Sequence, residues 1–385
     1  MSHFRGKRLI FGTFLRRSDR TKTQDRVEPV SESSVPAALP DLAGEKRRAL
    51  DLASTYLLDD LSPKVRLSLA EALAEDGGAP RPVILALTED RPDIAATVIA
   101  RSPVLTDNDL IDIVGRGGPE MRAAVSVRKC VSVPVAAALA QVGGRFEIAL
   151  LLRNPGAHMT ANVMVRLASR CGKDATIREL LLAREELPVT ARHILIEKIG
   201  DTLTDADLVT ALLPPRKRER IRREACEAAL VRVLGLAGES ELAEMVEHLR
   251  LEGRLSTMFL IHALCAGRTG FFAEVISNLS GVARVRSRAI LASGRPRAVR
   301  ALIEAAGIDR EVSDVFCEAV AIWREEGGDL PGDTGIFLRL AERCRAQKDL
   351  SAAAHTLVDS VERLAITEMR QMAKAYVHEL LSEAA

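Results

Sequence analysis

The sequence predicts an all-α protein built from stacked helical hairpins, and three observations support this fold class. First, an apolar, alanine-rich octet followed or closed by an arginine occurs three times, beginning at Asp93, Glu120 and Arg145. Second, each octet is followed by another apolar segment that ends near a glycine. Third, no segment alternates apolar and polar residues over the length of a strand. Recurrence at a period of about 20 to 50 residues is typical of repeat arrays, in which each hairpin buries its apolar face against its neighbours.

The composition is consistent with small, closely packed helices. Of the 385 residues, 47% are hydrophobic but only 3% are aromatic, so Ala, Leu, Val and Ile must build the core. The chain is longer than one compact core usually supports. Its net charge is +1, so any electrostatic function must come from local segregation of charge. The six cysteines are scattered and never form a C-x-x-C pair, which indicates a reduced, cytoplasmic setting.

Four parts are expected along the chain. They are a disordered basic tail (1–40), a helical repeat array (41–215), a second helical domain (216–330) and a C-terminal helical cap or dimerisation hairpin (331–385). Ser62-Pro63 predicts a helix start, because serine can cap the first turn and proline removes an amide that has no partner there. Pro214-Pro215 marks the boundary after the array.

Both ends of the chain suggest contacts. The segment from His3 to Arg17 mixes basic residues with phenylalanines, so it could hold the protein peripherally at the inner membrane, although a solvated tail is the simpler interpretation. The last helix carries apolar residues at steps of three and four, which suits either capping of the array or a homodimer. No apolar run is long enough for a membrane helix, and no secretory segment is present, so export is not expected.

Two groups of arginines are candidate binding sites for an anionic partner. The first group closes or follows the three octets, where equivalent positions would stack into a ladder; the alternative is that each cation bonds the free carbonyls at a helix end. The second group lacks a nearby acid in sequence; the alternatives are a solvated face or pairing with the acidic segment 239–252. The candidates are Arg101, Arg128 and Arg153 in the first group, and Arg284, Arg286, Arg288, Arg295, Arg297 and Arg300 in the second.

No catalytic, cofactor-binding or metal-ligating constellation is predicted. The histidines stand singly, none is part of an H-E-x-x-H motif, and no glycine-rich phosphate loop follows a strand. His262 lies in an apolar helical segment and is expected to be a core residue.

Two stretches resemble a known family. The segment Val98 to Leu110, with Ser126 to Arg128 and Arg153 to Pro155, and the later segment Leu255 to Gly267, resemble an alphaproteobacterial family of short HEAT-like repeats, catalogued as domain of unknown function 2336. The resemblance covers most of residues 41 to about 323. It implies an all-helical cytoplasmic protein that is not an enzyme, and it supplies no catalytic residue.

The sequence therefore favours a HEAT-like solenoid that binds another protein, with a role in bacterial regulation. The alternative is a nucleic-acid-binding protein, for example in DNA repair, that places arginine ladders on phosphates. The near-neutral charge and the few aromatic residues argue against this alternative.

Overall fold

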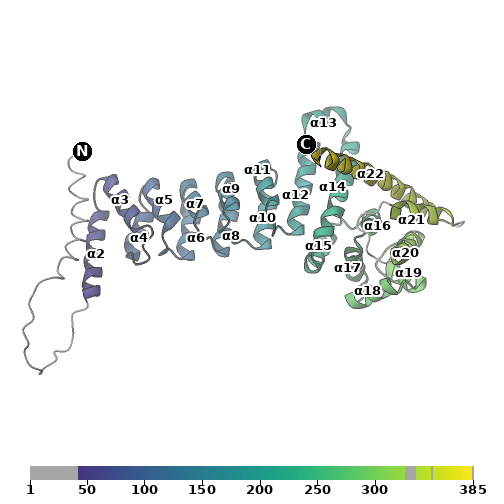
Figure 1. Ribbon diagram of the computed structural model, residues 1–385, viewed down its shortest axis with the longest axis horizontal. Helices are drawn as coiled ribbons and strands as arrows, with labels where there is room; N and C mark the ends of the chain where they lie inside the picture. Colours follow the sequence, from purple (N-terminus) through teal and green to yellow (C-terminus); the bar gives the residue numbers. More distant parts are fainter. Residues whose placement is uncertain (1–41, 326–334, 348–349, 384–385) are drawn as a thin grey trace, which may run out of the picture. The chain divides into compact units, whose positions relative to one another are not determined.

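The computed structural model describes residues 42–325, 335–347 and 350–383, and this part of the chain is helical (Figure 1). It contains no β-strand; an isolated parallel bridge joins Val131 to Ala157. The predicted all-α class is therefore confirmed. The predicted basic tail, residues 1–40, lies outside the described residues. None of the described helices has the length and apolar content that crossing a lipid bilayer requires.

Residues 54–385 form one compact unit and residues 1–53 another. Within residues 1–53, the structure describes only the part of helix α2 from Leu42 to Ala53. The helices are α2 (Leu42–Leu58), α3 (Pro63–Leu73), α4 (Arg81–Thr88), α5 (Pro92–Arg101), α6 (Asp107–Arg116), α7 (Pro119–Ser126), α8 (Val133–Val142), α9 (Arg145–Arg153), α10 (Ala161–Cys171), α11 (Ala175–Leu182), α12 (Val189–Thr204), α13 (Asp207–Leu212), α14 (Pro215–Val233), the 3₁₀ turn η1 (Leu234–Leu236), α15 (Glu239–Leu251), α16 (Thr257–Cys265), α17 (Thr269–Ser280), α18 (Arg284–Ser293), α19 (Pro296–Ala305), α20 (Arg310–Glu325), α21 (Gly335–Arg345) and α22 (Ala352–Glu383).

The recurring octets lie in α5, α7 and α9, and the apolar segments that follow them lie in α6, α8 and α10. Alternate helices touch: α3 contacts α5, α5 contacts α7, α7 contacts α9 and α9 contacts α11. The even-numbered helices touch in the same way: α6 contacts α8, α8 contacts α10 and α10 contacts α12. Neighbours in sequence also pack, as α6 does on α7 and α8 on α9. Each octet with its following segment is thus one helical hairpin that packs against the next hairpin (Figure 1).

Proline and glycine set the ends of these short helices. The predicted start at Ser62-Pro63 is confirmed, with proline in the first turn of α3. Gly117-Gly118 ends α6 and begins α7, and Gly143-Gly144 does the same between α8 and α9. A Cβ added to Gly117 would lie only 2.5 Å from the carbonyl oxygen of Ile113. Glycine is needed there because the chain turns against the end of its own helix.

Three apolar cores run along the described part of the chain. The first contains residues between Leu69 and Ala157, and the second contains residues between Ala140 and Leu195. The third, from Val189 to Ala365, is the largest and includes buried phenylalanines of α16, α17 and α20. Helix α12 contributes Leu195 to the second core and Val189 to the third, so this helix joins the repeats to the helices that follow.

Polar side chains from one hairpin donate hydrogen bonds to the backbone carbonyls at the helix ends of the hairpin before it. The guanidinium of Arg128, just after α7, donates to the carbonyl oxygens of Ile99 and Ser102 at the end of α5; the bond to Ser102 measures 2.8 Å. Asn154, just after α9, donates to Ser126 and Arg128 at the end of α7. The last carbonyls of a helix have no partner within that helix, so these donors satisfy groups that packing would otherwise leave unpaired.

The same arrangement recurs along the chain. Arg184, just after α11, donates to Asn154 at 2.8 Å and to Leu152 at 3.0 Å, at the end of α9. Arginines also donate to carbonyls at or just after the ends of α6, α8, α12, α14 and α18, and these are Arg122, Arg170, Arg218, Arg268 and Arg324. At the end of α16 the donor is the indole nitrogen of Trp323, 2.7 Å from the carbonyl oxygen of Leu264.

We expect Arg128→Ala to lower the free energy of unfolding by about 1 to 3 kcal/mol, because carbonyls at the end of α5 lose their half-buried donor. Arg153→Ala is the matched control: Arg153 follows an equivalent octet but is exposed, so its loss should change stability by no more than about 0.5 kcal/mol. Urea unfolding of both variants measures the difference. Equal midpoints for the two variants would show that the carbonyl bonds contribute nothing.

Candidate functional site

The arginines of the three octets occupy two different environments. Arg101 and Arg153 are the last residues of α5 and α9, and both are exposed. Arg128 lies beyond the end of α7, is half-buried and bonds the carbonyls of α5. Burial lowers the pKa of the Arg128 guanidinium. The carbonyls that Arg128 bonds belong to the preceding hairpin and not to its own helix. Anion binding by these three residues stays a prediction.

Three residues of the second arginine group are held by carboxylates. Arg284 lies 2.5 Å from Glu274, Arg288 lies 2.9 Å from Glu239, and Arg300 pairs with Asp314. For Arg288 this is the predicted alternative, pairing with the segment 239–252. The remaining three are exposed and make no ion pair within the described part of the chain; they are Arg286, Arg295 and Arg297.

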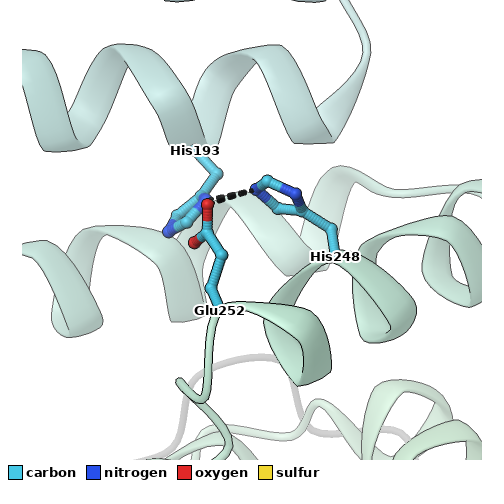
Figure 2. Close-up of side chains that lie close together, drawn as sticks. All are labelled: His193, His248 and Glu252. Carbon is cyan, nitrogen blue, oxygen red and sulfur yellow. Dashed lines mark hydrogen bonds and ion pairs between the residues drawn. The ribbon is translucent and has the colours of Figure 1, made fainter.

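A cluster that the sequence analysis missed lies between α12 and α15. Figure 2 shows His193 of α12, His248 of α15 and Glu252, which caps α15, pointing toward one another. Nδ1 of His193 lies 3.3 Å from Nε2 of His248, and the latter lies 3.4 Å from a carboxylate oxygen of Glu252. The ring centroids are 5.3 Å apart and the rings are nearly perpendicular. Two imidazoles and a carboxylate therefore converge, although 55 residues separate the two histidines.

The environment keeps His193 uncharged. Its side chain is only 3% exposed, whereas His248 is 27% exposed and Glu252 43%. Burial, followed by the positive charge that His248 can carry and that of Arg254, lowers the pKa of His193 to about 3. At neutral pH this imidazole therefore has one free lone pair and one N–H.

A group of charged side chains lies beside His193, on the other side of the ring from His248. The carboxylate of Glu197 lies 3.8 Å from Nε2 of His193. It accepts a 2.6 Å bond from Arg222 and another bond from Arg254. Arg222 is also bonded to Glu219, at 2.8 Å. Glu197 is therefore fixed in position between the buried histidine and two cations.

A small pocket opens beside His193 on this side. It has room for about one water-sized molecule. Its walls are polar and apolar, formed by His193, Glu197, Cys226, Glu227, Leu230, Leu249, Arg254 and Phe259. Burial raises the pKa of Cys226 to about 11, so the thiol is protonated at neutral pH and is a poor nucleophile. Burial also raises the pKa of the Glu227 carboxyl.

Within the described residues, His193, His248 and Glu252 form the one group of three or more metal-binding side chains close enough to share an ion. Imidazole and carboxylate are common ligands of zinc. A sequence signal was present: His193 precedes Glu197 by four residues, and His248 precedes Glu252 by four residues. Both helices thus carry the same histidine–glutamate pair, but only the packing of α12 on α15 shows that the pairs face each other.

His262, the predicted core histidine, is buried as expected. It lies 3.9 Å from a carboxylate oxygen of Glu368 on α22 and packs its ring edge against Phe337.

We expect Glu197→Gln to lower the free energy of unfolding by about 1 to 3 kcal/mol, since two half-buried guanidiniums lose their shared carboxylate. Glu247→Gln is the matched control, because Glu247 pairs with Arg250 at an exposed site, where solvent screens the pair, so this change should lower the stability far less. Thermal and urea unfolding of both variants compare the two. A control as destabilised as Glu197→Gln would contradict the importance of the half-buried network.

Comparison with known proteins identifies the family of the chain. No curated protein and no solved structure matches the chain. The family model described as an uncharacterised protein conserved in bacteria matches residues 94–375, from α5 into α22. The match begins later than residue 41 and extends beyond residue 323, so it includes the last helices as well as the hairpins that carry the resemblance. The chain therefore belongs to this bacterial family, DUF2336.

Proposed function

We propose that this protein is a non-catalytic, HEAT-like helical-repeat scaffold that binds another protein, in the context of bacterial regulation. The succession of hairpins from α3 to α12, in which alternate helices touch, supports a solenoid. The pocket beside His193 has room for about one water molecule, which is too little for an organic substrate at that position.

One observation carries the proposal: α22 leaves a stripe of large apolar side chains exposed. The first half of this 32-residue helix packs on α16, α20 and α21. Further along, apolar side chains remain 39% to 63% exposed, and these are Ile366, Met369, Met372, Tyr376 and Val377. Soluble surfaces rarely expose such contiguous apolar groups unless they meet a partner.

The spacing of the stripe indicates what kind of partner fits. Ile366, Met369, Ala373 and Tyr376 follow one another at steps of three, four and three residues. These steps place the four residues along one seam of the helix, as in helix pairs that interdigitate their side chains. Methionines adapt to the shape of a facing surface. The stripe therefore suits an amphipathic helix of a partner protein.

Site-specific photo-crosslinking tests this surface. We expect a photoreactive residue at Met372 to crosslink one defined protein in the native cell, and Met369→Glu with Tyr376→Glu to abolish the product. Thr367→Glu is the control, because it adds one negative charge, against two in the double variant, at an exposed position on another side of α22. Purified partner should bind the control and not the double variant.

Two results would contradict the proposal. A crosslinked product that survives Met369→Glu with Tyr376→Glu would show that the stripe does not bind the partner. A product that contains only two copies of this chain would show that α22 forms a homodimer instead.

The alternative function is nucleic-acid binding. Five of the nine predicted arginines favour it, because they are exposed and make no ion pair in the described residues; they are Arg101, Arg153, Arg286, Arg295 and Arg297. The other four are engaged by carbonyls or carboxylates. Few aromatic side chains are available for stacking on bases.

We expect no retention of the full chain on duplex DNA at about 50 mM salt, where phosphate contacts are strong. Gel shift and salt-gradient elution provide the measurement. Salt-dependent binding that is lost on changing Arg295 and Arg297 to Glu, but kept on changing the paired Arg288, would favour the alternative over the protein scaffold.

A further inference from the structure

We propose that His193, His248 and Glu252 bind a zinc ion that links α12 to α15. This inference goes beyond the scaffold role and does not depend on it. The three ligands come from two helices that contribute to the largest core, and α12 also contributes to the core of the repeats. An ion held here would therefore stabilise the connection between the repeats and the helices that follow.

Two of the three distances between the ligand atoms match those of a tetrahedral site. Zinc binds histidine nitrogen and carboxylate oxygen at about 2.0 to 2.1 Å, so ligand atoms at tetrahedral positions lie about 3.3 to 3.4 Å apart. Nδ1 of His193 and Nε2 of His248 are 3.3 Å apart, and Nε2 of His248 and the Glu252 oxygen are 3.4 Å apart. All three atoms lie within 4.8 Å of one another. The half-exposed side chain of Glu252 has the freedom to close the third distance.

A carboxylate lies near His193 on the side where a metal-binding histidine usually has its supporting partner. When one ring nitrogen binds the ion, the other N–H commonly faces a carboxylate, which fixes the ring and its tautomer. With Nδ1 of His193 toward the ion, Nε2 faces the carboxylate of Glu197 at 3.8 Å. Arg222 and Arg254 hold that carboxylate in place.

The donor set selects the class of metal. Two imidazoles and one carboxylate favour zinc or a similar transition metal over magnesium and calcium, which prefer oxygen ligands. Three protein ligands leave a fourth tetrahedral position for water or for a side chain of another molecule. The partial exposure of His248 and Glu252 gives an ion access from solvent.

Zinc titration of the full chain, stripped of metal with a chelator, tests the site. We expect isothermal titration calorimetry to show one zinc ion per chain, and zinc to raise the melting temperature. Cobalt(II) should give the intense visible absorption of a tetrahedral complex. His248→Ala and Glu252→Gln should each weaken zinc binding by at least about a hundredfold, because even the loss of a supporting carboxylate costs about ten- to a hundredfold.

The controls are His355→Ala and Glu247→Gln, an exposed histidine and an exposed glutamate outside the cluster; both should bind zinc as the unchanged chain does. We chose His248 and Glu252 for substitution because their side chains are partly exposed, so both variants should fold. Circular dichroism spectra recorded without metal check that they do. The proposal is overturned if the unchanged chain binds zinc no more tightly than His248→Ala and Glu252→Gln do. In that case the two histidines share only a hydrogen bond.

Discussion

The bonding of side-chain donors to carbonyls at helix ends is the interaction on which this fold depends. Short helices have a large share of their backbone groups at the ends, where no partner exists within the helix. Here the donors come from the following hairpin, as Arg128 does for α5, Asn154 for α7 and Arg184 for α9. Each hairpin therefore contributes both apolar contacts and hydrogen bonds to the one before it, which also fixes the register between them.

This arrangement explains why many arginines in the described part of the chain are engaged within the protein. Half-buried guanidiniums bond several carbonyls at once because the planar group carries five donors. Others are neutralised by carboxylates from neighbouring helices, as Arg284 is by Glu274. Half of the arginine group that lacks a nearby acid in sequence is thus paired in space, namely Arg284, Arg288 and Arg300. The surface open to a partner is better judged from exposed apolar groups such as those of α22.

The sequence predicted the helical class, the hairpins and their ends, because apolar periodicity and Gly-Gly or Ser-Pro pairs are local signals. It could not predict the different roles of Arg101 and Arg128, which follow equivalent octets but face solvent and backbone respectively. The difference arises because Arg101 is the last residue of α5, whereas Arg128 lies two residues beyond the end of α7. The cluster of His193, His248 and Glu252 could not be predicted either, because it forms only where α12 packs on α15.

The direction of the capping bonds has a consequence for how the protein is made. The ribosome synthesises the chain from its N-terminus, so α5 is complete before Arg128 has been added, 27 residues after Arg101. During that interval the carbonyl oxygens of Ile99 and Ser102 lack the guanidinium that bonds them in the folded protein. We therefore expect each of these hairpins to reach its full stability only after the hairpin that follows it has been synthesised.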